Sequence, residues 1–232
     1  MLGAMEPETR SAATARSSLW VPRLASLLLA LGVLGALWGT AYSINGMTQA
    51  PATVKAPVNL AGSELAAGWG NVRVQVTGVD VPAGWLAGAR PDGLQATGVD
   101  GGLTVAAWGS TRVEQLLGRG DWLIGGIGLL VGAVALRPVL LSIAAGRPFA
   151  PGNARRITLV AATVAVVGVV APLAPQIAGQ LVLARTGLAR TGAFVSTVAV
   201  SPEPLLVAAL VLAVATAFRA GEAMSRDVDG LV

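Results

Sequence analysis

The stretch ITLVAATVAVVGVVAPLAPQIA, residues Ile157–Ala178, contains no charged side chain. A helix needs about 20 mostly apolar residues to cross the roughly 30 Å hydrocarbon core of a bilayer. The stretch meets this requirement and predicts a membrane-spanning helix. Three other segments are almost as apolar, and in chain order they are Leu24–Ile44, Trp122–Ala145 and Pro202–Phe218. The sequence therefore predicts four membrane spans.

The composition supports a membrane protein. Of the 232 residues, 54% are hydrophobic and 12% are charged, whereas a soluble domain carries about 25% charged residues. This balance excludes a soluble globular chain, and also a disordered or nucleic-acid-binding one. The chain has no cysteine and no histidine, which excludes disulfides, Cys/His zinc sites, thiol nucleophiles and Ser-His-Asp triads. We expect no catalytic, cofactor-binding or metal-binding residues, and no enzyme.

The first apolar segment has two interpretations, an uncleaved anchor and a signal peptide. Small residues at Thr48–Ala50 suit a cleavage site, but Pro51 follows them directly. The apolar stretch is also longer than the 7–15 residues of a typical signal peptide. We therefore expect an uncleaved anchor.

Arginines predict the orientation. They gather before the first span, between the second and third spans, and after the fourth span, whereas the loop between the third and fourth spans has only Arg185 and Arg190. Short loops rich in Lys and Arg stay in the cytoplasm. We expect a multi-pass protein of the bacterial cytoplasmic membrane with both termini in the cytoplasm.

The long segment between the first and second spans has the patterning of β-strands. Val72, Val74 and Val76 alternate with polar residues, as in a half-buried strand. A second alternating run covers 54–60, where Pro57 predicts a sheet edge. Asp100-Gly101-Gly102 predicts a hairpin turn between strands at 94–99 and 103–108. We expect three to five strands in a small extracytoplasmic domain.

These observations predict a mainly α membrane protein with four transmembrane helices and a small β-rich domain between the first and second. The predicted parts are a cytoplasmic tail 1–23, a transmembrane helix 24–44, the extracytoplasmic domain 45–120, a three-helix transmembrane region 121–220 with a cytoplasmic arginine loop 146–156, and a cytoplasmic amphipathic tail 221–232.

Small residues recur every four positions in three of the spans. They are Gly35, Gly39, Gly128, Gly132, Ala209, Ala213, Ala217 and Gly221. Such spacing lets two helix backbones approach closely in a membrane. We favour packing of the four helices on one another, and the alternative is association with another chain.

Two cytoplasmic segments are candidates for contact with a partner. Their residues are Arg147, Phe149, Asn153, Arg155 and Arg156 in the loop, and Arg219, Asp227 and Asp229 near the C-terminus. Asn153 suits the N-cap of the third helix. The loop has two interpretations, a turn that sets topology, which we favour, and a docking site for an acidic partner or lipid. Asp227 or Asp229 can pair with Arg155 or Arg156.

The same two segments resemble a family of small bacterial membrane proteins catalogued as domain of unknown function 2975. The matching residues are Gly146, Pro148, Phe149, Asn153, Arg155 and Arg156, followed by Phe218, Arg219, Gly221, Asp227, Gly230, Leu231 and Val232. Met224 stands where the family usually has Leu. The resemblance implies four spans with an extracytoplasmic loop after the first, and a neighbouring gene for a helix-turn-helix regulator. It implies no catalytic residues.

We therefore expect a non-enzymatic sensory or regulatory protein that contacts a cytoplasmic partner such as a helix-turn-helix regulator. The alternative is an accessory or assembly subunit of a larger membrane complex. A transporter component ranks lower because no carboxylate lies near the centre of a span, where ion coupling usually needs one. The expected partners are membrane lipids and a protein in the cytoplasm or membrane, with a homo-oligomer as a further alternative and no direct binding of nucleic acid.

Overall fold

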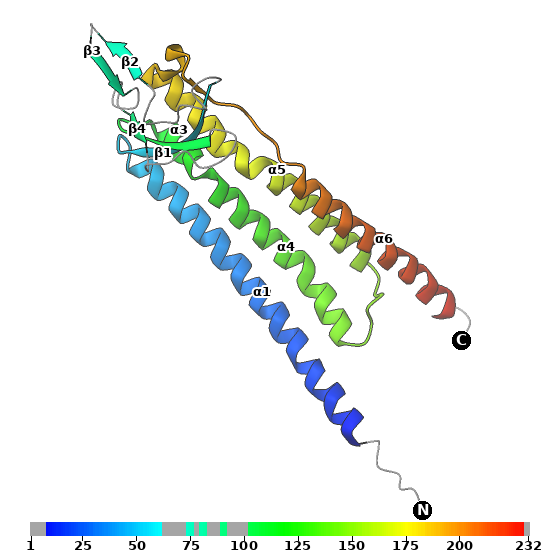
Figure 1. The fold of residues 1–232 in the computed structure, drawn as a ribbon. Helices are drawn as coiled ribbons and strands as arrows, with labels where there is room; N and C mark the ends of the chain where they lie inside the picture. The colour runs from blue at the N-terminus through cyan, green and yellow to red at the C-terminus, as the bar shows by residue number, and fades with distance from the viewer. Residues whose placement is uncertain (1–7, 62–72, 77–78, 83–88, 92–101, 230–232) are drawn as a thin grey trace, which may run out of the picture. The chain divides into compact units, whose positions relative to one another are not determined.

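The computed structural model is mostly helical and describes residues 8–61, 73–76, 79–82, 89–91 and 102–229 (Figure 1). Four of its helices are long and apolar enough to cross a membrane. They are α1 (Glu8–Thr48), α4 (Gly120–Ala144), α5 (Asn153–Thr186) and α6 (Glu203–Asp229). The prediction of four long apolar helices is confirmed.

Three helices run well beyond the apolar segments that predicted them, and α1 does so at both ends, from Glu8 to Thr48. α5 continues from Ala178 to Thr186 although it contains Pro172 and Pro175, residues that usually kink or break a helix. Its added turns bury Val182 and other side chains against a sheet, and this burial stabilises helix beyond the prolines. α6 likewise continues to Asp229, so the predicted tail forms the last turns of the same helix as far as that residue.

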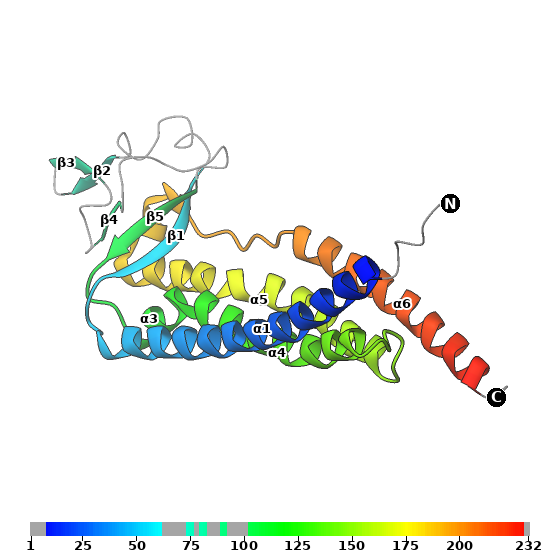
Figure 2. The same ribbon diagram turned by 90° about the horizontal axis from the view of Figure 1, so that it is seen from below.

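The strands form two antiparallel sheets. The larger sheet has the order β4-β5-β1-β6, and β2 pairs with β3 in the smaller one. The strands are β1 (Val54–Leu60), β2 (Arg73–Val76), β3 (Val79–Pro82), β4 (Ala89–Pro91), β5 (Gly102–Ala107) and β6 (Phe194–Val195). The described residues also contain two short helices, α3 (Arg112–Gly118) and η3 (Leu188–Thr191). Figure 2 shows β1 and β5 side by side.

The alternation predicted for 54–60 is confirmed in β1 as far as its side chains are described. Val54, Ala56 and Val58 are buried, and the intervening residues are exposed. The alternating valines at 74 and 76 lie in β2. The predicted strand at 94–99 and the hairpin turn at Asp100-Gly101 lie outside the described residues, while β5 begins at Gly102.

The prediction that Pro57 places its strand at a sheet edge is wrong for the strand as a whole. β1 lies between β5 and β6 in the sheet. However, β6 pairs only with Asn59 and Leu60, so no strand among the described residues pairs with Pro57 on that side. A proline lacks the N–H that a second neighbouring strand would use, and the local gap in pairing accommodates it.

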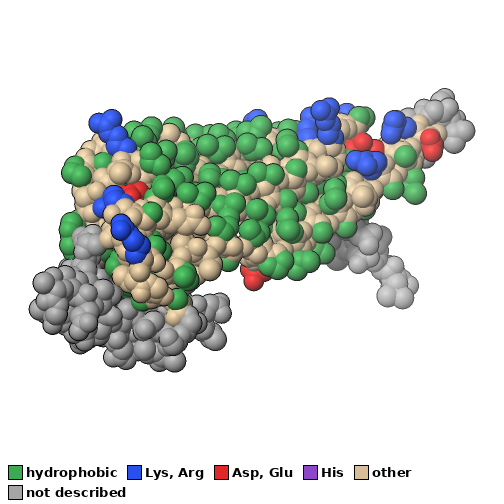
Figure 3. Space-filling view, turned by 90° about the horizontal axis from the view of Figure 1, so that it is seen from above, with side chains coloured by type: hydrophobic (Ala, Val, Ile, Leu, Met, Phe, Trp, Pro, Cys, Tyr) green, Lys and Arg blue, Asp and Glu red, His purple; other side chains and the backbone are tan. Residues whose placement is uncertain are grey.

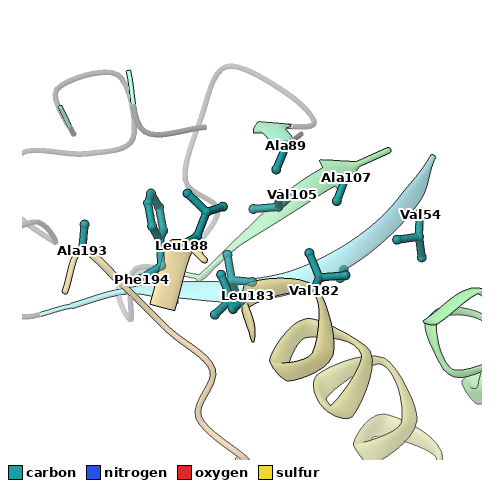
Figure 4. Packing of buried hydrophobic residues seen from close by; sticks show 11 residues of the cluster. Val54, Ala89, Val105, Ala107, Val182, Leu183, Leu188, Ala193 and Phe194 are labelled. Atoms are coloured by element: carbon teal, nitrogen blue, oxygen red, sulfur yellow. The ribbon is translucent and has the colours of Figure 1, made fainter. Parts of the chain in front are cut away.

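Two compact units divide the chain. Unit 1 contains residues 1–37, 126–168 and 202–232, and unit 2 contains residues 38–125 and 169–201. The core of unit 1 brings together Val139, Ile157 and Ala215, with Val211 and Phe218 packed against them. In unit 2, side chains of the sheet pack on the end of α5 and on η3 (Figure 4). The sheet also takes β6 from the connection between α5 and α6, outside the predicted β-rich segment 45–120.

Candidate functional site

In unit 1, the loop between α4 and α5 contacts the end of α6. The rings of Phe149 and Phe218 meet edge to face, with centroids 5.6 Å apart. A Cβ added to Gly221 would lie 2.3 Å from Cδ1 of Phe149, so a side chain at this position would displace the ring. The structure therefore brings together two of the segments that the sequence predicts as contact surfaces.

Two glycines shape this loop. Gly146 and Gly152 have φ angles of 73° and 89°, a conformation that L side chains adopt only with strain. Gly146 follows the end of α4, and Gly152 precedes the start of α5. The loop reverses the chain between the two helices, and Phe149 lies between the two turning points.

Asn153 is the polar centre of the loop. Its side chain is fully buried, at 0% exposure, and its Nδ2 donates to Ser142 Oγ at 2.6 Å and to the carbonyl of Pro148 at 2.9 Å. Its Oδ1 accepts a bond from Nη1 of Arg156 at 3.2 Å. We expected Asn153 to cap α5, but these bonds of its side chain run to α4, to the loop and to a guanidinium.

The first turn of α5 is capped by another helix. Oε1 of Glu222, on α6, accepts a hydrogen bond from the backbone N–H of Ala154 at 2.8 Å. The first turn of α5 contains no acidic residue of its own, and a carboxylate at a helix N-terminus stabilises both the unpaired amides and the helix dipole. We call Phe149, Asn153, Phe218, Gly221 and Glu222 the loop–tail clasp.

The predicted charged residues lie around the clasp, and the expected pairing can be checked only for Asp227. The side chains of Arg147, Arg155 and Arg219 are exposed and have no ion pair or hydrogen bond in the described part of the chain. Asp227 is exposed and makes no ion pair there with Arg155 or Arg156, and the side chain of Asp229 lies outside the description. Figure 3 shows basic side chains gathered beside acidic ones near the described end of α6.

Glycines allow close contact between α1 and α4. In unit 2, a Cβ on Gly39 would lie 2.2 Å from the carbonyl oxygen of Trp122. In unit 1, a Cβ on Gly126 would lie 2.3 Å from the carbonyl oxygen of Gly35. Gly126 was not among the predicted packing residues, because it stands outside the four-residue spacing that singled out Gly128.

The remaining small residues behave differently from one another. A Cβ on Gly128 would lie 2.4 Å from Val167 of α5, whereas nothing lies within 4 Å of one on Gly132. Three alanines of the α6 stripe, Ala209, Ala213 and Ala217, are exposed. The packed face of α6 instead carries Pro204, Ala208, Val211, Ala215 and Phe218.

Unit 2 contains a polar cluster that the sequence analysis missed. Glu114 is 2% exposed, and its Oε1 lies 2.8 Å from Nε of Arg185 near the end of α5. The same carboxylate accepts the N–H of Thr111 at 2.9 Å, which completes a capping box at the start of α3. The spacing Thr111-x-x-Glu114 is a local signal for the cap, but nothing in the sequence identifies Arg185 as the partner.

A cavity of about 190 Å³ opens in unit 2, and its walls are neutral. The backbone N–H and carbonyl of Ala199 bond to the side chain of Gln176 at 2.8 and 3.0 Å. Asn59 donates to Thr197 across the same region. These polar groups satisfy one another and fasten the connection after β6 to α5. The cavity is lined by Pro57, Val58, Asn59, Gln176, Ser196, Thr197 and Ala199.

Among the described residues, no three Asp or Glu side chains come together as a metal site would require. Comparisons of the chain with models of protein families, with curated proteins and with solved structures find no match. The resemblance to domain of unknown function 2975 therefore stays a prediction. The loop–tail clasp, with the arginines around it, is the candidate site for contact with a partner.

Proposed function

We propose that this chain is a non-enzymatic regulatory or sensory protein of a bacterial cytoplasmic membrane. Its four long helices span the bilayer, its sheets lie on the extracytoplasmic side, and the loop–tail clasp faces the cytoplasm. The clasp presents a combined surface to a cytoplasmic protein, for which a helix-turn-helix regulator is the leading candidate.

Interfacial aromatic residues support insertion into a membrane. Trp20 and Trp38, both exposed on α1, are separated by about 27 Å along an ideal helix at 1.5 Å per residue. This spacing is close to the roughly 30 Å of the hydrocarbon core, at whose borders tryptophan and tyrosine gather. In unit 2, Tyr42 stacks on Trp38 and meets Trp122 edge to face. The guanidinium of Arg119 lies 4.7 Å from the centroid of the Tyr42 ring.

The loop–tail clasp is the observation that supports a cytoplasmic contact. It fixes the end of α6 to the arginine loop, and the exposed stretch that begins at Ala223 follows it directly. Phe149 remains 42% exposed and Met224 69% exposed. Exposed apolar side chains between arginines suit a protein partner, since arginine and large apolar residues are enriched at interfaces.

A pull-down from native membranes tests this function. The full chain would carry an N-terminal tag, and the test variant would lack residues 223–232 but keep Glu222. We expect the full chain to recover a stoichiometric cytoplasmic protein that the shortened chain loses. Arg112→Gln is a matched control, because this exposed arginine lies on α3 in unit 2. Recovery of the same proteins both by the shortened chain and by a Phe149→Ala variant, which alters the clasp itself, would contradict the proposal.

The exposed alanines of α6 favour one alternative, an accessory subunit of a larger membrane complex. Ala209, Ala213 and Ala217 form a small-residue stripe that no described element covers. A second helix can approach such a stripe closely in lipid. Ala213→Leu would then dissociate a membrane complex on a native gel, whereas Val207→Ala, at an exposed position on a different face of the same helix, would leave it intact.

A further inference from the structure

Three arginines beside the clasp make no ion pair and no side-chain hydrogen bond in the described part of the chain. They are Arg147 in the loop, Arg155 on α5 and Arg219 on α6, and all three are exposed. The nearby Glu222 accepts the N–H of Ala154 through Oε1 and makes no ion pair with these arginines in the described part of the chain. The region around the clasp therefore carries guanidinium groups that are available to an external anion.

Two of these arginines lie at nearly the same level. The bond between Glu222 and Ala154 places the start of α5 beside this part of α6. Arg155 is the next residue along α5, and Arg219 precedes Glu222 by less than one turn of α6. At 1.5 Å per residue, the two positions differ by about 3 Å along the helix axes. An anion layer at one depth would thus meet both arginines.

Each arginine also shares a helix face with an exposed leucine. Leu159 follows Arg155 by four residues, and Leu212 precedes Arg219 by seven. Residues at these spacings lie on the same face of a helix. Both leucines are exposed, so each face presents an apolar surface that ends in a guanidinium. A lipid has the matching order, with acyl chains below a phosphate.

We propose that Arg155 and Arg219 bind the phosphate of anionic phospholipids in the cytoplasmic leaflet, while Leu159 and Leu212 contact the acyl chains. This inference rests on the proposed insertion of the chain into the membrane with the clasp on the cytoplasmic side. Arginine suits the ligand because its planar fork forms paired hydrogen bonds to phosphate oxygens. The bound lipid anchors the two helices that the clasp joins.

Lipid retention on the purified full chain tests the proposal. The protein would be placed in nanodiscs that mix phosphatidylglycerol and phosphatidylcholine, and retained lipids would be counted by native mass spectrometry. The wild type should retain phosphatidylglycerol preferentially. A basic residue near an anionic surface contributes about 1 kcal/mol, or about fivefold in affinity. We therefore expect the double variant Arg155→Gln/Arg219→Gln to lose at least fivefold of this preference.

The control removes the same charge from another part of the chain. Arg112→Gln/Arg190→Gln changes two exposed arginines of unit 2 and should keep the preference of the wild type. Equal retention of phosphatidylglycerol by the double variant and the wild type would overturn the inference. It would also be overturned if soluble glycerol phosphate raised the melting temperature of the wild type as much as phosphatidylglycerol does. Both proposals are supported if the chain without residues 223–232 loses a protein partner that the full chain recovers, and if the wild type prefers phosphatidylglycerol. If the wild type prefers phosphatidylglycerol but the full chain recovers no protein in the pull-down, the lipid inference is supported and the proposed protein contact is contradicted.

Discussion

Single glycines decide how closely α1 and α4 approach in unit 1. The site where a Cβ of Gly126 would stand is 2.3 Å from the carbonyl oxygen of Gly35, which is backbone and cannot move aside cheaply. Gly132, on the same helix, has nothing within 4 Å of the corresponding site. The two glycines therefore form a matched pair for mutation.

We expect Gly126→Ala to lower the free energy of unfolding by about 2 kcal/mol, because overpacking against backbone forces shifts of this magnitude. Gly132→Ala should change it by less than about 1 kcal/mol, since alanine meets no neighbour and favours helix. Thermal unfolding in mild detergent, followed by tryptophan fluorescence, measures both variants. Similar melting temperatures for the two would show that the glycine contact does not limit stability.

The ion pair of Glu114 and Arg185 is a second feature whose contribution to stability can be tested by a single substitution. Glu114→Gln should lower the free energy of unfolding by about 2 kcal/mol, less than for a fully buried pair. The reason for the reduction is that the side chain of Arg185 remains 28% exposed, so water stabilises the guanidinium that is left. Arg112→Gln, exposed on the same α3 helix, should unfold like the wild type. An equal loss in both variants would argue against the buried pair as the cause.

At the scale of elements, α5 depends on α6 for its first turn. Glu222→Ala removes the acceptor for Ala154 N–H, and loss of a helix cap costs about 1 kcal/mol. We expect amide hydrogen exchange in the first turn of α5 to become about fivefold faster, because local opening sets the exchange rate.

Conservative and remote variants make this prediction specific. Glu222→Gln keeps an acceptor oxygen and should preserve much of the protection. Met224→Ala changes a side chain that is exposed on the same helix and should leave exchange at Ala154 unaltered. Fast exchange in the Met224→Ala variant would indicate general fraying of α6 instead of a lost cap.

The elements also show what the sequence can predict. Hydropathy predicts the four long helices because a run of apolar residues is a local property. Alternation predicts β1 for the same reason. The cap on α5 joins residues 68 positions apart, and no local pattern signals it. The predicted packing of the alanine stripe of α6 within the helix bundle is not observed for a related reason. Spacing identifies a face of small residues but does not identify the neighbour that packs on it.

At the scale of the molecule, charge bias and contact geometry agree on which segments lie on one side in the proposed membrane topology. The arginine loop and the end of α6 were assigned to one side by the positive-inside rule. In unit 1 they touch, through Phe149 and Gly221. An odd number of spans between them would have kept them apart, so this contact supports the proposed topology.

Single introduced cysteines test that topology, and the chain is suited to it because it has no cysteine of its own. Ser225→Cys, exposed after the clasp, should react with a membrane-impermeant maleimide only in inside-out vesicles. Ala189→Cys, exposed in η3, should react only from outside intact cells, since an α-helical span such as α6 separates the two positions. Labelling of both cysteines from the same side would show that α6 does not span the membrane. Labelling of each cysteine from the side opposite to the expected one would show that the orientation is the reverse of the proposed one.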